Sequence, residues 1–186
     1  MNTLIAKIDP APTDKITSRI GGNIPIFFTN KTKQIENLNF YACLQDPENK
    51  DQYLSIFVPK EYSDMIEKNI YPNCSIKVIP HVFSTESEDE SYTIKQIKKS
   101  SIANYKKAAT GTTNFITKSE RPILIQEEDY YHKQLTQDNY TFYLQIDEDY
   151  YPKDLLTGNY IFGYGTLYLY KNNLTDEVIA GFWQYS

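Results

Sequence analysis

The sequence has few of the side chains that enzymes use for proton transfer and metal binding. Among 186 residues there are two histidines, His81 and His132, and two cysteines, Cys43 and Cys74. Catalysis needs a nucleophile, a proton-transfer group or a metal. Neither histidine has a convincing partner, since His81 lies in an apolar run typical of a strand and His132 lies in a polar segment. The cysteines form no CxxC pair, which predicts two buried reduced thiols and no zinc site.

The common catalytic and nucleotide-binding motifs are also missing. The chain contains no HExxH, no GxSxG and no P-loop. The Gly21-Gly22 pair is followed by Pro25 and apolar residues, which favours a tight turn over a phosphate-binding loop. We therefore expect a protein that is not an enzyme and that binds no metal or cofactor.

Long apolar runs and excess positive charge are absent as well. No window approaches the roughly 20 apolar residues of a membrane span, and the N-terminus lacks a signal-peptide pattern, which predicts a cytoplasmic protein without membrane contact. The formal net charge is -5 and the pI about 5.1. This balance argues against nucleic-acid binding and suits a basic protein partner.

Aromatic residues are abundant, with seventeen tyrosines against one tryptophan. Flat amphipathic rings suit half-buried pleated sheets, so this composition favours a β-rich fold. In the segment 162–170, "FGYGTLYLY", alternation directs Leu167 and Leu169 to one face of a strand and Tyr168 and Tyr170 to the other. Strand composition recurs in "FYACLQ", "YLSIFV", "IKVIPHVF", "TTNFIT", "RPILIQ", "YTFYLQI" and "EVIAGFWQYS".

One longer helix is expected at about 87–109, besides a short one in "KEYSDMIEKNIYPN". Ser87 and Glu90 have the spacing of a capping box, and acidic residues precede a lysine-rich stretch in the order that complements a helix dipole. A solvated helix face is the simplest interpretation of these lysines, with anion or nucleic-acid contact as the alternative.

The order of patterns repeats along the chain, and such a repeat changes the predicted fold. Segments 20–83 and 112–186 each run from a proline through an apolar stretch to three strands, and Gln45 aligns with Gln145. We expect a single domain over 1–186, built as an internal duplication whose halves the helix at 87–109 joins. The predicted fold class is α+β and β-rich, with antiparallel sheets from two related halves and one connecting helix.

Four sequence islands resemble the YwqG-like family of bacterial proteins: "RIGGNIP", "RPILIQ", "YLQID" and "GYGTLYLY" with the later "FWQYS". The resemblance implies a mixed α+β architecture with two related halves, and some relatives look like immunity or antitoxin components. This chain departs from the family in three places. Tyr164 replaces the acidic residue of a Gly-Asp-x-Gly turn, a Trp-Pro pair is missing, and the central glycine pair is not evident. A polar site at those turns would be lost or altered here.

The segment after the predicted strand 140–146 is the best candidate for a binding surface. Asp147, Glu148 and Asp149 precede Tyr150 and Tyr151, so carboxylates that steer a basic partner stand beside aromatic anchors. The alternatives are a solvated acidic loop and a site for a metal or acid-base catalysis, although the glycine typical of hard-cation loops is missing.

Phe162 and Tyr164, at a glycine-rich turn, are expected to be exposed and to extend this surface. We therefore hypothesise a non-enzymatic protein-binding module, an immunity protein that neutralises a toxin with a basic domain. The alternative is a small-molecule-binding or hydrolytic protein that uses a cleft between the halves.

Overall fold

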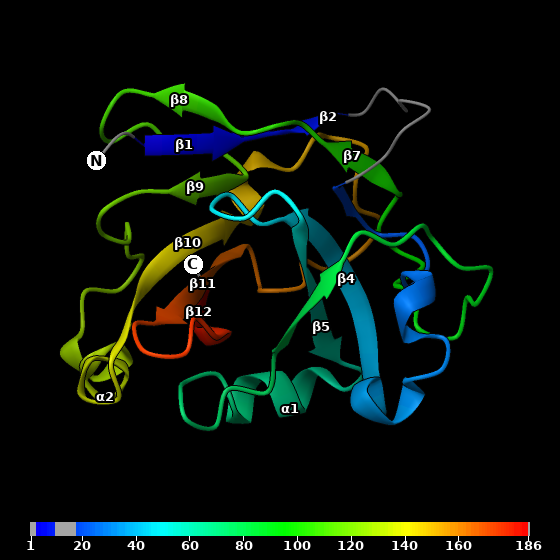
Figure 1. The fold of residues 1–186 in the computed structure, drawn as a ribbon, viewed down its shortest axis with the longest axis horizontal. Coiled ribbons are helices and arrows are strands. Elements are labelled where there is room, and N and C mark those ends of the chain that lie inside the picture. The colour runs from blue at the N-terminus through cyan, green and yellow to red at the C-terminus, as the bar shows by residue number, and fades with distance from the viewer. Residues whose placement is uncertain (1–2, 10–17, 186) are drawn as a thin grey trace.

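Two six-stranded antiparallel sheets form the framework of the protein in the computed structural model, which describes residues 3–9 and 18–185 (Figure 1). The first sheet contains β1 (Thr3–Ala6), β8 (Lys106–Ala108), β9 (Ile116–Lys118), β10 (Tyr140–Asp147), β11 (Gly165–Asn172) and β12 (Val178–Tyr185). The second contains β2 (Ile8–Asp9), β3 (Arg19–Ile20), β4 (Leu38–Gln45), β5 (Gln52–Pro59), β6 (Lys77–Val82) and β7 (Ser100–Ile102).

Helices are few and short in the described part of the chain. They are α1 (Tyr62–Glu67), α2 (Lys133–Gln137) and the single 3-10 turns η1 (Ile26–Phe28), η2 (Thr32–Ile35), η3 (Asp129–Tyr131) and η4 (Glu148–Tyr150). The predicted β-rich α+β class with antiparallel sheets is thus confirmed. Among the described residues, no helix is both long and apolar enough to cross a membrane.

The two sheets repeat one strand order. The first runs β12-β11-β10-β9-β1-β8 and the second β6-β5-β4-β3-β7-β2. Residues 3–9 supply β1 to the first sheet and β2 to the second. Residues 100–108 supply β7 to the second sheet and β8 to the first. These two runs pair antiparallel, with Leu4 opposite Lys107 and Ile8 opposite Ile102. They lie together at the top of Figure 1 and tie the sheets to each other.

A β-bulge marks the same place in each half. The register shifts at Tyr41 in β4 and at Tyr143 in β10. When the two bulges are aligned with each other, Gln45 corresponds to Asp147 and not to Gln145. The alignment expected from the sequence was therefore displaced by two residues. The shared strand order is a property of the structure, whereas its origin by gene duplication stays a prediction.

The main hydrophobic core lies where the two sheets pack face to face. It includes Leu44 and Leu54 from the second sheet and Ile146 and Leu167 from the first, together with Trp183. The outer face of each sheet is covered separately. Phe28 and Ile35 of η1 and η2 pack on β4 and β5, and Tyr131 and Leu135 of η3 and α2 pack on β11 and β12.

Leucine and tyrosine side chains alternate between the two faces of β11, as predicted. Leu167 and Leu169 join the main core, whereas Tyr168 and Tyr170 are buried on the other face beside Leu135 of α2. A strand buried on both faces explains why one stretch of sequence carries both leucine and tyrosine.

The helix predicted at 87–109 does not form, so that prediction was wrong. The segment contains turns followed by β7 and β8. Ser87 accepts a hydrogen bond from Asp89 N at 3.2 Å and donates its own N–H to the carbonyl of Ile24 at 2.9 Å, so its side chain closes a turn instead of capping a helix. The isoleucines expected to form a helical stripe, Ile94 and Ile97, are buried in the main core from the two ends of a turn, in which Ile97 N–H donates to the carbonyl of Ile94 at 3.0 Å.

The strand expected in "RPILIQ" is also absent. Residues 121–126 are irregular, and side chains of the first sheet satisfy part of their backbone: Ile123 N–H donates to Gln145 Oε1 and Ile125 N–H to Gln184 Oε1, each at 2.9 Å. Two buried glutamines therefore take the place of a neighbouring strand.

Candidate functional site

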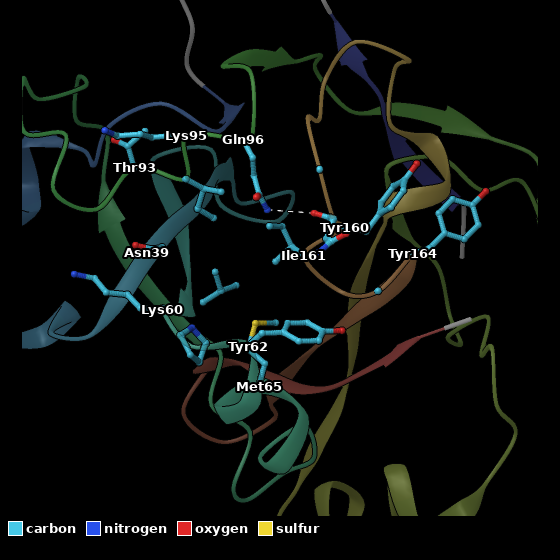
Figure 2. Close-up of a pocket in the computed structure, with 16 residues that line it drawn as sticks. Asn39, Lys60, Tyr62, Met65, Thr93, Lys95, Gln96, Tyr160, Ile161 and Tyr164 are labelled. Carbon is cyan, nitrogen blue, oxygen red and sulfur yellow. Dashed lines mark hydrogen bonds between the residues drawn. The ribbon is translucent and has the colours of Figure 1, made fainter.

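A pocket of about 860 Å³ opens between the two halves of the sequence. The first half supplies the start of β4, the end of β5 and α1. The link between the halves supplies residues 93–96, and the loop between η4 and β11 supplies residues 158–164. Figure 2 shows this loop facing β4, β5 and α1 across the pocket. The location matches the cleft between the halves that the sequence suggested as an alternative site.

Backbone hydrogen bonds fix the link against the second-half loop. Lys98 N–H donates to the carbonyl of Leu155 at 2.7 Å, and Thr157 N–H donates to the carbonyl of Gln96 at 2.9 Å. The Gln96 side chain donates to the carbonyl of Asn159 at 3.2 Å, the dashed line in Figure 2. The pocket therefore has walls joined by main-chain contacts.

Glu148 holds the same loop from inside the protein. Its side chain is fully buried and accepts hydrogen bonds from Ile161 N at 2.8 Å, Phe162 N at 3.0 Å and Gly165 N at 3.2 Å. Burial raises the pKa of Glu148 to about 7, although the three N–H donors favour the carboxylate. One carboxyl group thus positions the wall of the pocket.

Tyr164 is the most unusual residue at the rim. Its φ is +62°, in the left-handed region that large side chains rarely adopt, and its side chain is 45% exposed. Gly163 before it has φ +64°, and Gly165 after it approaches Gln184 so closely that any side chain would overlap the Gln184 carbonyl. The flanking glycines therefore allow the turn to project a tyrosine outward.

Aromatic side chains connect this rim to the core. The Tyr164 ring lies 4.9 Å from that of Tyr160, which stacks on Tyr151 at 5.8 Å. The Tyr151 and Tyr41 hydroxyls are hydrogen-bonded at 2.7 Å. On the opposite wall, Tyr62 is 47% exposed and lines the pocket. Exposed tyrosines from α1 and from the loop 158–164 thus both line the pocket, and the Tyr62 hydroxyl lies next to Gly163.

The polar side chains of the pocket lining are amides, hydroxyls and lysine ammonium groups. Its sixteen residues include no histidine, cysteine, serine, aspartate or glutamate. The charged members are Lys60 and Lys95, and the remaining polar contacts come from asparagine, glutamine, threonine and tyrosine. Such a lining offers hydrogen bonds, positive charge and aromatic surface, and it contains none of the histidine or carboxylate side chains that most often transfer protons.

The structure separates the residues predicted to form the acidic surface. Asp149 is exposed and raises the pKa of Tyr164 through its negative charge. Asp147 is half-buried and accepts a hydrogen bond from Asp149 N at 2.9 Å, and burial raises its pKa. Tyr150 is 37% exposed and bonds to Thr113.

Three predicted partner-binding residues are not exposed as expected. Phe162 has 0% exposure and packs against Tyr41 and Trp183, so the expectation that it would be accessible was wrong. Glu148 anchors the loop internally, and Tyr151 packs against the core. Of the seven predicted residues, Tyr164 alone lines the pocket.

The other residues of the pocket were not predicted as a binding surface. The charged and aromatic ones come from three separate stretches with no shared motif, which hold Lys60 with Tyr62, Lys95, and Tyr160. The glycines around Tyr164 are the local signal that points to this region, because they indicate a forced turn.

His81 and Cys43 lie buried together in the second sheet. His81 lies in β6 as predicted and is buried, with Ser55 Oγ at 2.8 Å and Cys43 Sγ at 3.7 Å from its Nε2. Both cysteines are free thiols, Cys43 buried and Cys74 half-buried. Within residues 3–9 and 18–185, no three His, Cys, Asp or Glu side chains are grouped to hold a metal.

Comparison with known proteins gives no family assignment: no family model matches the chain, and no curated protein matches it. The resemblance to YwqG-like proteins stays a prediction that rests on the sequence islands.

Proposed function

We propose that this protein is a non-enzymatic protein-binding module whose binding surface is the pocket between the halves and its tyrosine rim. The biological role we propose is that of an immunity protein, which neutralises a toxin by covering a functional surface of it. Tyr164 carries the proposal. It is large, half-exposed, and held in a left-handed conformation that glycine or asparagine would adopt with less strain.

An exposed tyrosine in a strained conformation suggests that binding has been favoured over stability at this position. Tyrosine is enriched among the residues that dominate the energy of protein interfaces, because its ring buries a large area and loses little conformational entropy. Tyr62 and Tyr164 both line the pocket and are each nearly half-exposed. They supply two anchors for one partner surface.

The lining of the pocket supports binding over catalysis. Its polar groups can donate and accept hydrogen bonds, but none is a usual nucleophile paired with a base. Asp149 beside Tyr164 adds negative charge at the rim, which suits basic residues of a partner around the pocket.

A second candidate function is the binding of a small molecule in the same pocket. The observation that favours it is the volume of about 860 Å³, which lies within the range of roughly 300–1,000 Å³ typical of small-molecule sites. A ligand screen against the isolated protein separates this candidate from the first, because a small molecule would bind without a second protein.

Co-expression tests the proposed role. The chain would be produced with each product of the genes adjacent to its own, and complex formation and cell survival would be scored. We expect a stable complex and rescue from toxicity, and we expect Tyr164→Asn to weaken the complex at least tenfold, as is common for an interface anchor. Tyr130→Asn is the matched control, since Tyr130 is 55% exposed but lies in η3, outside the pocket lining.

Two results would argue against this proposal. A complex that forms equally well with Tyr164→Asn would place the interface elsewhere. Absence of any complex, with toxicity unrelieved, would favour the small-molecule candidate.

A further inference from the structure

The pocket is electrically polarised although the chain as a whole is acidic. Lys60, directly after β5, and Lys95, in the link between the halves, both line it. In Figure 2 these lysines lie at one end, and Tyr160 and Tyr164 lie at the other. A net charge of -5 thus coexists with two exposed lysines at one end of this pocket.

Neither lysine is neutralised by the protein. Among the described residues, no carboxylate lies within ion-pair distance of Lys60 or Lys95, whereas the nearby Lys99 is paired with Glu86. Lys60 faces the ring of Tyr92 at 5.7 Å, a contact that leaves its charge intact. Both lysines are exposed, so an anionic group of a partner can reach either of them.

The neutral lining suits a peptide. Asn39 and Asn159 carry side-chain amides for which the described part of the chain provides no hydrogen-bond partner, and each amide both donates and accepts. Backbone N–H and C=O groups need such two-way partners when they are buried. The tyrosines opposite the lysines offer apolar surface for a side chain of the same segment.

On the basis of the proposed protein-binding function, we propose that the segment entering this pocket is an acidic peptide of the partner protein. Its Asp or Glu carboxylates meet Lys60 and Lys95, while an adjacent apolar or aromatic side chain packs against Tyr160 and Tyr164. This reverses the expectation from net charge alone. A basic surface of the partner would suit the acidic rim, but an acidic segment suits the end of the pocket where the two exposed lysines lie.

Short peptides test the charge preference on the full chain. Backbone amide NMR signals would be followed during titration with N-acetyl-Glu-Tyr-Glu-amide, with N-acetyl-Lys-Tyr-Lys-amide and with inorganic phosphate. We expect the acidic peptide to shift signals of residues 93–96 and 158–164, and the basic peptide to leave them unchanged. We expect Lys60→Gln with Lys95→Gln to weaken acidic-peptide binding about tenfold, and the loss to shrink in high salt.

Two further variants separate the charge claim from the pocket claim. Lys50→Gln with Lys133→Gln makes the same charge change at exposed lysines outside the lining and should leave binding unchanged. Asn159→Trp fills the pocket without changing charge and should block the acidic peptide and the partner alike. If Asn159→Trp blocks binding of the partner but the double substitution Lys60→Gln with Lys95→Gln does not weaken it, the protein-binding function stands and the acidic-peptide inference is wrong.

Three other outcomes would overturn the inference. Equal binding of the two peptides would remove the role of charge. Binding of phosphate at residues 93–96 without the acidic peptide would assign the lysines to a small anion. If neither Asn159→Trp nor the lysine pair affects the partner, the proposed binding surface itself is wrong.

Discussion

Replacing Glu148 by glutamine should change how the stability of this protein depends on pH. The Glu148 carboxyl is fully buried and receives three backbone N–H groups from the pocket loop. Burial raises its pKa from an ordinary 4.5 to about 7. The folded state therefore binds this proton more tightly than the unfolded state does.

The sign and size of the effect follow from that difference. The contribution to the free energy of unfolding is fully present below pH 4.5 and is lost as pH rises through 7. At about 1.4 kcal/mol per pKa unit the whole effect is about 3 kcal/mol, of which roughly 2.5 kcal/mol falls between pH 5 and pH 8. The Glu148→Gln side chain cannot ionise. The difference in free energy of unfolding between the native protein and this variant should therefore decrease by roughly 2.5 kcal/mol from pH 5 to pH 8.

Urea unfolding of the native protein and of Glu148→Gln at pH 5, 6, 7 and 8 measures the difference directly. Asp149→Asn is the control, because Asp149 is exposed and its replacement should give nearly parallel stability curves. If the disadvantage of Glu148→Gln grows toward pH 8, the three N–H donors outweigh burial and the carboxylate is the preferred form. That result would refute the reasoning.

Three other predictions concern residues away from the pocket surface. Gly165→Ala should lower the free energy of unfolding by about 3 kcal/mol or prevent folding, because its methyl group would overlap the Gln184 carbonyl; a native urea midpoint would contradict this. Tyr143→Phe should cost about 1.5–3 kcal/mol in the same assay, because buried Asp46 loses its hydroxyl donor. Burial lowers the pKa of His81, so its contribution to stability is present above pH 6.5 and lost below it; the thermal midpoint of His81→Gln should fall less than that of the native protein on acidification.

Strands with strong alternation could be predicted from the sequence because local pattern and burial agree there. In β11, Leu167 and Leu169 face the main core and Tyr168 and Tyr170 face α2, as the two-residue period requires. The same agreement locates β4, β5, β10 and β12, whose residues are long apolar runs bounded by turns.

The region 87–109 could not be predicted from local signals because its partners are distant in sequence. The spacing of Ser87 and Glu90 fits a helix start, but β7 and β8 pair with strands that begin some eighty or more residues earlier. Pairing of this kind is decided by tertiary contacts, which override weak helical propensity. The strand predicted at 121–126 was wrong for a related reason. Side chains of Gln145 and Gln184 accept hydrogen bonds from its backbone N–H groups, so no neighbouring strand is needed there.

The pocket was predictable only in outline. A cleft between the halves follows from a repeated fold, but which aromatic residue of "FGYG" faces outward does not follow from composition. Phe162 points inward because Glu148 binds its N–H and Tyr41 and Trp183 surround its ring, whereas the left-handed turn at Tyr164 points that side chain outward. The lysines of the pocket come from segments with no common pattern.

The most direct test of the central claim is photo-crosslinking at the pocket rim. p-Benzoylphenylalanine would replace Tyr164 in one protein and Tyr130 in another, each co-expressed with the products of the adjacent genes and irradiated in the cell. The proposed binding surface predicts a covalent adduct with one partner protein from position 164 and none from position 130. An adduct from position 130 alone, or none from position 164 although a complex forms, would contradict it.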